Sequence, residues 1–333
     1  MVSTIKDVAK LAGVSVSTVS RVLNRSGYIS VATCEKVYDA VRQLDYKPNS
    51  IAQSLKKNSS HTIGLVVTDI TNPYFAAIAK GAESYFSQYG YNLIICNTNE
   101  SPKKEKIHLD MLFDRRVDGI LLCSTGQNNA AIQSLLKAEV KIILIDRTCP
   151  GLTLDIIKDN NEYGAYELTK LLLKRGHTKI AFLRGATGST ASIEREKGWR
   201  DALKEEGLPA HDEWIYTTGA SGEKVREAIA SILSLEERVR PTALFACNSL
   251  IARQVMMRLN ELSIETPKQM ALVCYGLEEF KTLYRPSVTC VVQHPDYVGY
   301  LSAKLMVERL EEDGEETPKE IILAPDVFEG QST

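Results

Sequence analysis

The chain has 333 residues, of which 44% are hydrophobic and 25% are charged, and its formal net charge is −2. This length is too great for one ordinary domain and predicts two or three compact units. Residues 1–10 lack the apolar run of a secretory signal, and apolar runs elsewhere are far shorter than the roughly 20 residues of a membrane span. We therefore expect a soluble, cytoplasmic protein without a membrane partner.

The charge is distributed unevenly along the chain. Residues 1–60 contain nine Lys or Arg and four acidic residues, whereas residues 61–333 contain 31 basic and 38 acidic residues. A basic head on an acidic remainder indicates that only the head meets a polyanion. A solvated basic face without a partner has the same composition, so charge alone does not decide the function.

The cysteines are scattered, without a CxxC pair or a neighbouring pair of histidines, and a disulfide framework or metal cluster needs tighter spacing. We interpret them as reduced, mostly buried thiols and expect no metal and no cofactor. The seven are Cys34, Cys96, Cys123, Cys149, Cys247, Cys274 and Cys290.

The first elements of the chain are two short helices. Residues 4–12 place apolar side chains at i, i+3, i+4 and i+7, with Thr4 as N-cap and Gly13 as the residue that ends the helix. Ser15 then caps a second helix over residues 16–24. Two helices joined by a short turn around a glycine form a helix-turn-helix.

A third amphipathic helix is predicted over residues 31–44 and completes a small all-α head. Pro48 ends this region, and residues 50–57 offer only a short helix that is marginal in water without a partner. Residues 58–61 are typical of a linker.

From residue 62 onward, strand-like runs alternate with helical patterns, which predicts βαβ units and parallel sheets. The predicted strands are residues 62–70, 91–97, 117–123, 140–146, 178–184, 242–248 and 270–276. The predicted helices are residues 73–90, 102–115, 126–138, 161–175, 192–207, 222–235 and 249–263. A last helix at about Asp296–Leu310 and a short strand near Ile321–Leu323 follow.

The number of units favours two similar α/β lobes that divide near Asp159–Tyr163. The predicted organisation is a head at 1–57, a linker at 58–61 and a body at 62–333. Lobe 1 is expected to comprise about 62–160 and 293–320, and lobe 2 about 161–292 and 321–333.

Several segments resemble the LacI/GalR family of bacterial repressors, in the expected order and over almost the whole chain. They are TIKDVAKLAGVSVSTVSRVLN (4–24), YKPNSIAQSLK (46–56), IGLVVTDITNPYF (63–75), RRVDGILL (115–122), ILIDR (143–147), DNNEYGA (159–165), RPTALFACN (240–248) and the final QST. The resemblance implies a homodimer whose bodies are shaped like periplasmic sugar-binding proteins and close around a small molecule. It also implies double-stranded operator DNA as the partner of the head.

In such heads the second helix enters the major groove with its first residues toward the bases. By resemblance, the positions that face the bases are Val16, Ser17, Arg21 and Asn24. Arg21 can form a bidentate pair with guanine, and Val16 can contact a thymine methyl group. The alternative for Val16 is a place in the core of the head.

The hydroxyl groups of Thr4, Thr18 and Tyr28 are expected to contact phosphates. Tyr28 could instead pack on the third helix. By resemblance, Leu55 is the wedge that paired 50–57 helices insert into the minor groove, with Lys56 beside it. A leucine folded onto the body is the alternative.

In the body, the resemblance matches ligand-facing positions at Tyr74, Phe75, Arg147, Asp159 and Arg195. Each follows a strand at the edge where open α/β sheets bind ligands. Arg195 could instead form a surface ion pair, and Asp159 could be a structural hinge residue.

Two positions depart from the family pattern. Asn248 is followed by Ser249 rather than by an acid, and Gly276 stands where an acid commonly follows the next strand. Both positions stay in the predicted effector site. The cleft lacks these two carboxylates but keeps Arg147 and Arg195, so it should repel anions less. We therefore expect a sugar acid or sugar phosphate as effector, with a neutral sugar or a nucleobase as alternatives.

Two other classes of function compete with a regulator. A sugar-binding transport protein would need a signal peptide and no helical head. An enzyme would need a chemical motif, and none of GxGxxG after a strand, GxxxxGK, GxSxG or HExxH occurs. The sequence therefore predicts a dimeric, non-enzymatic repressor of carbohydrate-related genes, which binds a pseudopalindromic operator.

Overall fold

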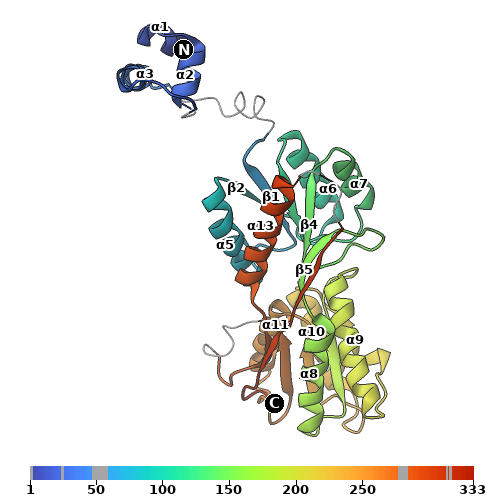
Figure 1. Cartoon of the computed structure of the whole chain (residues 1–333). Helices are drawn as coiled ribbons and strands as arrows, with labels where there is room; N and C mark the ends of the chain where they lie inside the picture. Colours follow the sequence, from blue (N-terminus) through green and yellow to red (C-terminus); the bar gives the residue numbers. More distant parts are fainter. Residues whose placement is uncertain (1–2, 24–25, 47–58, 277–283, 313, 315–316) are drawn as a thin grey trace. The chain divides into compact units, whose positions relative to one another are not determined.

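The computed structural model describes residues 3–23, 26–46, 59–276, 284–312, 314 and 317–333 (Figure 1). The chain divides into two compact units, Met1–Ser60 and His61–Thr333, and the division falls inside the predicted linker. Each unit is described separately below. Among the described residues, no helix combines the length and the apolar character that a bilayer crossing requires.

The first unit is a three-helix head, as the apolar spacing predicts. Thr18 donates its backbone N–H to Ser15 Oγ at 3.1 Å, which caps the second helix, and Gly13 ends the first helix with a φ of 67°. The helices are α1 (Ile5–Ala12), α2 (Val16–Leu23) and α3 (Val31–Gln43). They enclose a core of Val8, Ala9, Ala12, Val19, Val22, Val37 and Ala40. The helix predicted at residues 50–57 lies outside the described residues.

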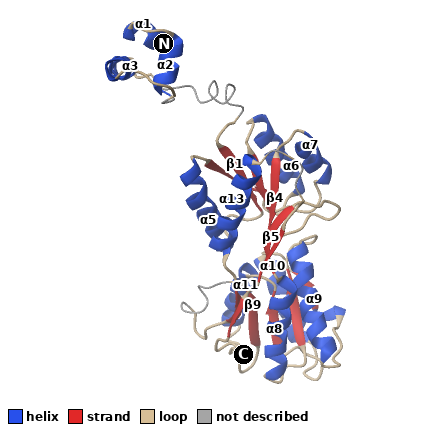
Figure 2. Ribbon diagram, viewed as in Figure 1, coloured by secondary structure: helices blue, strands red, loops and turns tan. Residues whose placement is uncertain are grey.

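The first sheet of the body is parallel throughout and has the strand order β11-β5-β4-β3-β1-β2. Its strands are β1 (Thr62–Val67), β2 (Asn92–Asn97), β3 (Gly119–Leu122), β4 (Lys141–Ile145), β5 (Asp155–Asp159) and β11 (Glu320–Leu323). Helices α5 and α13 cover one face and α6 and α7 the other (Figure 2). These helices are α5 (Pro73–Phe86), which continues as η1 (Ser87–Tyr89), α6 (Pro102–Asp114), α7 (Asn129–Lys137) and α13 (Pro295–Glu311).

The second sheet has the order β12-β10-β9-β8-β6-β7, in which only the edge strand β12 is antiparallel among the described residues. Its strands are β6 (Ile180–Arg184), β7 (Ile215–Thr217), β8 (Ala243–Ala246), β9 (Ala271–Tyr275), β10 (Thr289–Val292) and β12 (Asp326–Phe328). Its helices are α8 (Asn161–Lys174), α9 (Thr190–Glu205), η2 (Asp212–Trp214), α10 (Gly222–Ser234) and α11 (Ser249–Glu261).

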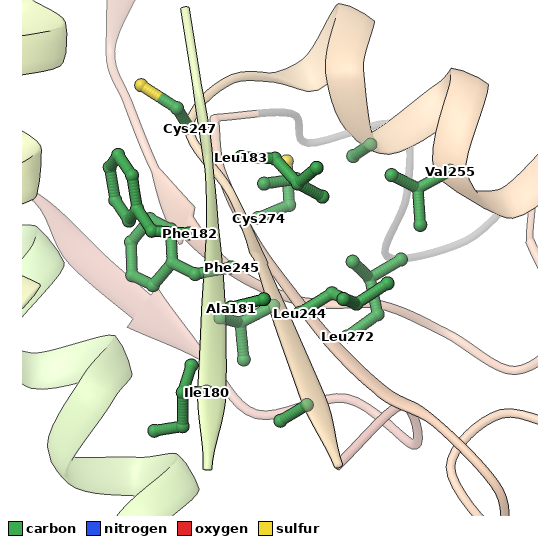
Figure 3. Close-up of a cluster of buried hydrophobic side chains, with 14 of the residues drawn as sticks. Ile180, Ala181, Phe182, Leu183, Leu244, Phe245, Cys247, Val255, Leu272 and Cys274 are labelled. Atoms are coloured by element: carbon green, nitrogen blue, oxygen red, sulfur yellow. The ribbon is translucent and has the colours of Figure 1, made fainter. Parts of the chain in front are cut away.

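The buried core of the second lobe lies on both faces of its sheet. Figure 3 shows Phe182 and Phe245 on one side of the strands and Leu183 with Val255 on the other. The two phenylalanine rings lie 5.1 Å apart, and Phe182 lies 5.6 Å from the Trp199 ring of α9. Burial on both faces explains why these strands are continuous apolar runs in the sequence.

Four strands, β5, β7, β10 and β12, were not predicted. Each is three to five residues long. A second difference concerns the predicted lobe boundary. Residues 321–333 were assigned to lobe 2, but β11 pairs with β5 of the first sheet, with Ile321 beside Ile157. Only the part of this tail from β12 onward joins the second sheet. Within the described residues the chain therefore passes between the lobes three times, after β5, β10 and β11.

Helices α5 and α13 cross so closely that glycine is required at the contact. A Cβ atom at Gly81 would lie 1.9 Å from the backbone oxygen of Asp296. We expect Gly81→Ala to lower the free energy of unfolding by about 1–3 kcal/mol, because two backbones would have to separate. In the control Gly222→Ala, the new Cβ meets only the flexible end of Gln254 and should cost little. Urea unfolding followed by circular dichroism measures both; equal stabilities would contradict the prediction.

A nearly buried ion pair joins β5 to α13. Asp155 accepts hydrogen bonds from Arg309 Nε and Nη2, each at 2.8 Å, and from the backbone N–H of Lys319 at 2.7 Å. Burial alone would raise the pKa of Asp155, but these hydrogen bonds outweigh it and hold the pKa below its ordinary value of 3.8. The stabilisation is therefore complete above pH 3.8 and is lost as the pH falls through the lower folded-state pKa.

We expect Asp155→Asn to lower the free energy of unfolding at pH 7 by about 3 kcal/mol, because the buried Arg309 then loses its bidentate carboxylate partner. The variant should also lose less stability than the parent protein between pH 4 and pH 2. Urea unfolding across this pH range measures both effects. Asp110→Asn, which removes an exposed pair with Lys106, is the control and should change little. A parallel pH dependence of parent and Asp155→Asn would refute the assignment.

Candidate functional site

The predicted base-facing residues of the head lie at the exposed start and flank of α2. Val16 is 42% exposed and stands apart from the core of the head, so the alternative that buries it is wrong. Ser17 and Arg21 are also exposed. Tyr28 is fully exposed, so it does not pack on α3. This surface therefore presents an apolar, a hydroxyl and a cationic side chain together.

The hydroxyl groups near this surface form local hydrogen bonds. Ser15 Oγ lies 2.8 Å from both Ser17 Oγ and Thr18 Oγ1. Thr4 Oγ1 donates to Asp7 Oδ2 at 2.7 Å, and the Thr4 backbone N–H donates to the same atom at 2.9 Å. Each hydroxyl oxygen keeps acceptor or donor capacity for a further partner.

Three residues of the predicted DNA surface cannot be placed. Asn24, Leu55 and Lys56 lie outside the described residues. The wedge role of Leu55 therefore stays a prediction.

In the body, a cavity of about 300 Å³ lies between the two lobes. Six of the seven predicted effector residues line it: Tyr74, Phe75, Arg147, Arg195, Asn248 and Gly276. They come from segments far apart in the chain that meet at the carboxyl ends of both sheets. This is where open α/β sheets bind ligands.

Several helices begin at the wall of the cavity. Asn72 caps α5 by accepting from the Tyr74 N–H at 3.1 Å, and Asn248 caps α11 by accepting from the Ile251 N–H at 2.9 Å. The two caps approach each other, because Ser249 Oγ lies 3.5 Å from Asn72 Oδ1. The amino ends of α9 and α13 contribute further wall residues. Helix amino ends favour negative charge, both that of anions and the partial charge of neutral oxygen atoms.

A carboxylate occupies the Nη edge of the Arg147 guanidinium group, whereas the buried Nε has no hydrogen-bond partner among the described residues. Its Nη1 and Nη2 atoms donate to Glu100 Oε2 at 2.8 Å and Oε1 at 2.7 Å, and its Nε lies 3.6 Å from Asp146 Oδ2. Burial opposes the charge, but Cys123 and the two carboxylates raise the pKa of Arg147 above its ordinary value. Arg147 is therefore a paired cation rather than an open anion site.

Arg195 is buried, so the alternative of a surface ion pair is wrong. It donates from Nε to Asn161 Oδ1 and from Nη1 to the carbonyl oxygen of Cys247, each at 2.8 Å. Its Nη2 lies 3.8 Å from Asp146 Oδ1, and its guanidinium carbon lies 3.8 Å over the centre of the Tyr275 ring. These contacts fix the guanidinium group at the wall of the cavity.

Asp159 does not line the cavity and lies behind the wall. Its Oδ2 accepts from Gln293 Nε2 at 2.5 Å, whereas its Oδ1 and the Tyr74 hydroxyl are buried and have no hydrogen-bond partner among the described residues. Burial raises the pKa of the Asp159 carboxyl, and the bond from Gln293 offsets only part of this. Burial also raises the pKa of Tyr74, together with the nearby Asp146 and Asp159 carboxylates.

The wall residues that sequence reasoning missed include Glu100, Asp146, Tyr275 and Gln293. Asp146 has a φ of 64°, and the Arg147 N–H donates to the Ile145 carbonyl at 2.6 Å, which makes a γ-turn. The rule that ligand residues follow strands could have found Asp146, which directly precedes Arg147. It could not find Gln293, because β10 was not predicted.

Two further contacts join the lobes beside the cavity. Thr190 Oγ1, at the start of α9, accepts from the Thr148 N–H at 3.0 Å. Glu194 of α9 forms an ion pair with Lys158 of β5 at 2.8 Å. Because α9 also carries Arg195, one helix contacts both the cavity and the opposite lobe.

The geometry changes the expectation about the effector. The absence of acidic residues at positions 249 and 276 suggested a cleft that binds anions. The structure instead places Glu100 against Arg147, and Asp146 against both Arg147 and Arg195. The cavity wall carries three carboxylates, with Asp69 as the third, against two guanidinium groups. The sequence argument counted only the acids at family positions and so left Glu100, Asp146 and Asp69 out of the charge balance of the wall.

Comparison with known proteins decides the family. Residues 4–49 match the model of bacterial regulatory proteins of the lacI family, and residues 60–328 match that of periplasmic binding proteins and the sugar-binding domain of the LacI family. The chain belongs to the LacI family. This LacI-family chain is 35% identical to the HTH-type transcriptional repressor PurR of Aliivibrio fischeri strain MJ11 over 315 residues, which covers 94% of each chain.

Solved structures of regulators share the fold of this LacI-family chain. A complex of the transcriptional regulator CelR with cellobiose is 26% identical and has a TM-score of 0.74, with 99% of this chain and 100% of that chain covered. The Lac repressor dimer bound to operator and the anti-inducer ONPF has a TM-score of 0.84 at 24% identity, with 100% and 99% covered. The LacI-family chain is therefore a DNA-binding transcriptional repressor with an effector-binding body, and its relatives are regulators rather than enzymes. Members of this family act as dimers on operator DNA.

Proposed function

We propose that the repressor is controlled by a neutral, hydroxyl-rich small molecule of about monosaccharide size that binds in the cavity between the lobes. The observation that carries the proposal is the pairing of both wall arginines with carboxylates. An anionic ligand would have to displace these carboxylates or lie beside them, and like charges repel. A neutral ligand needs no change in this pairing.

The remaining wall supports hydroxyl groups as the main recognition feature. Paired carboxylates and guanidinium groups provide fixed acceptors and donors, and a hydroxyl group can use both. The wall from the second lobe is formed largely by small residues. These are Gly185, Ala186, Ser189, Ala191, Ser192, Ala220 and Gly276. A volume of about 300 Å³ is at the lower end for small-molecule sites.

A nucleobase is the second candidate, because Tyr74, Phe75 and Tyr275 bring aromatic rings to the wall. Two of these rings are poorly placed for stacking. The Arg195 guanidinium group covers a face of Tyr275, and Phe75 is only 3% exposed. These observations favour the hydroxyl-rich ligand.

For DNA recognition we propose that α2 reads the major groove through Val16, Ser17 and Arg21, with Asn24 beyond them. The hydroxyl groups of Thr4, Thr18 and Tyr28 contact phosphates, and Leu55 with Lys56 enters the minor groove. Two heads of a dimer then require a pseudopalindromic operator.

Control of the operator follows from linkage. A ligand that binds one arrangement of the lobes more tightly shifts their packing, and α9 transmits the shift because it contacts the cavity and both lobes. The ligand must then change operator affinity by the same factor by which the operator changes ligand affinity.

Calorimetric titration of the full chain tests the proposal with a panel of neutral monosaccharides and disaccharides, their sugar acids and phosphates, and purine and pyrimidine bases. Saturable binding of a neutral sugar, together with a change in operator affinity in a gel-shift titration, is the expected result. Tight binding of a sugar acid, a sugar phosphate or a base without any neutral sugar would overturn it.

A further inference from the structure

Glu100 reaches the cavity from an unusual stretch of backbone. It follows β2 in the loop before α6, where Asn99 and Glu100 have φ values of 51° and 56°. The Glu100 N–H donates to the Thr68 carbonyl at 3.2 Å, which ties this loop to the end of β1. Two consecutive non-glycine residues with positive φ are uncommon. Such conformations persist where the surrounding structure fixes them, and they cluster at functional sites. The result is a side chain aimed at Arg147.

The contact with Arg147 uses the whole carboxylate. Both Glu100 oxygens accept from the two Nη atoms, which is the parallel bidentate geometry that an outside carboxylate or phosphate would adopt. Glu100 therefore occupies the position of an oxyanion ligand. Arg147 is buried and cannot swing out to offer this edge elsewhere.

We propose that Glu100 is a specificity-determining residue, which makes the cavity reject anions by filling the guanidinium edge of Arg147 from within the chain. The inference rests on the proposed neutral effector and names the residue that sets this preference. Removing the Glu100 carboxylate leaves two wall carboxylates against two guanidinium groups and frees one bidentate oxyanion position. The same cavity should then take a carboxylate or phosphate group.

The test uses the full chain, inorganic phosphate as probe, and isothermal titration calorimetry at pH 7. Glu100→Ala vacates the position, and Glu100→Gln keeps the shape of the side chain if the alanine variant fails to fold. Glu100→Ala should bind phosphate at least about tenfold more tightly than the parent protein. Glu100→Gln should also bind phosphate more tightly, but by a smaller factor, because its neutral amide oxygen can still accept from Arg147. Glu83→Gln is the control, because it changes the net charge by the same amount at an exposed position of α5. It should leave phosphate binding unchanged.

A second variant locates the new site. Adding Arg147→Met to Glu100→Ala should abolish the gained phosphate binding, because the bidentate donor is then gone. Equal phosphate affinity in the parent protein and in both Glu100 variants would overturn the inference. So would phosphate binding that survives Arg147→Met.

The sugar panel separates the two claims. If the parent protein binds a neutral sugar but the Glu100 variants gain no affinity for phosphate, only the role of Glu100 fails. If the parent protein binds a sugar acid or phosphate and no neutral sugar, the proposed function fails with it.

Discussion

Replacing Arg21 with methionine is expected to weaken binding to the preferred operator by about 1–3 kcal/mol per half-site, which is roughly 5- to 150-fold. Arg21 is exposed on α2 one turn after Val16 and Ser17, so a helix seated in the major groove would bring it to a base edge. Methionine keeps the length and apolar stem of arginine but removes its donors. Preference for one base in each half-site should relax as well.

The measurement is fluorescence anisotropy on an operator that the parent protein selects from random DNA, repeated at several salt concentrations. Arg42→Met is the matched control, because Arg42 is an exposed arginine of the same head, on α3, and pairs with Asp39. If Arg21 contacts a base, Arg21→Met should change the preference for one DNA sequence over another rather than the dependence of affinity on salt. If Arg21→Met weakens all sequences equally and lowers the salt slope by about one, Arg21 binds phosphate instead.

The second large effect is expected at Arg195. We predict that Arg195→Met lowers the free energy of unfolding of the body by about 3–5 kcal/mol, because Asp146 and the Cys247 carbonyl lose a buried partner. The variant should also lose ligand-dependent control of operator binding, since the wall of the cavity is rebuilt. Urea unfolding and operator titration measure the two consequences.

A double-mutant cycle separates the ion pair from the other contacts of Arg195. Asp146→Asn in the Arg195→Met background should cost less than Asp146→Asn alone, because the buried carboxylate has already lost one cation. Arg238→Met is the control for the charge change, since Arg238 is exposed and its side chain pairs with the neighbouring Glu236. Strict additivity of the two substitutions would show that Arg195 and Asp146 do not interact.

The described helices were predicted well because they repeat their apolar residues at helical spacing and many of them begin at a capping side chain. For α8, Asn160 accepts from the Tyr163 N–H at 3.1 Å, which fixes its start within the sequence itself. The short strands carry no such local signal. Strand β11 shows this best, because only pairing with β5, about 160 residues away, decides which lobe it joins.

The site was predictable where position along a strand determines it. Arg147, Asn248 and Gly276 lie within two residues of the ends of β4, β8 and β9 and line the cavity. Glu100 was not predictable, because it lies in a loop whose backbone geometry turns its side chain toward Arg147. The net charge at a cavity wall depends on such ion pairs, and the sequence alone does not show which acidic side chain pairs with which basic one.

The three passages of the chain between the lobes also constrain how the protein folds during synthesis. Lobe 1 lacks α13 and β11, and lobe 2 lacks β12, until the last 40 or so residues have left the ribosome. The head needs only residues 3–46 for its core and can fold when the body is still incomplete. A chain that stops before α13 would therefore carry a complete head core beside a body in which the first sheet lacks α13 and β11 and the second sheet lacks β12.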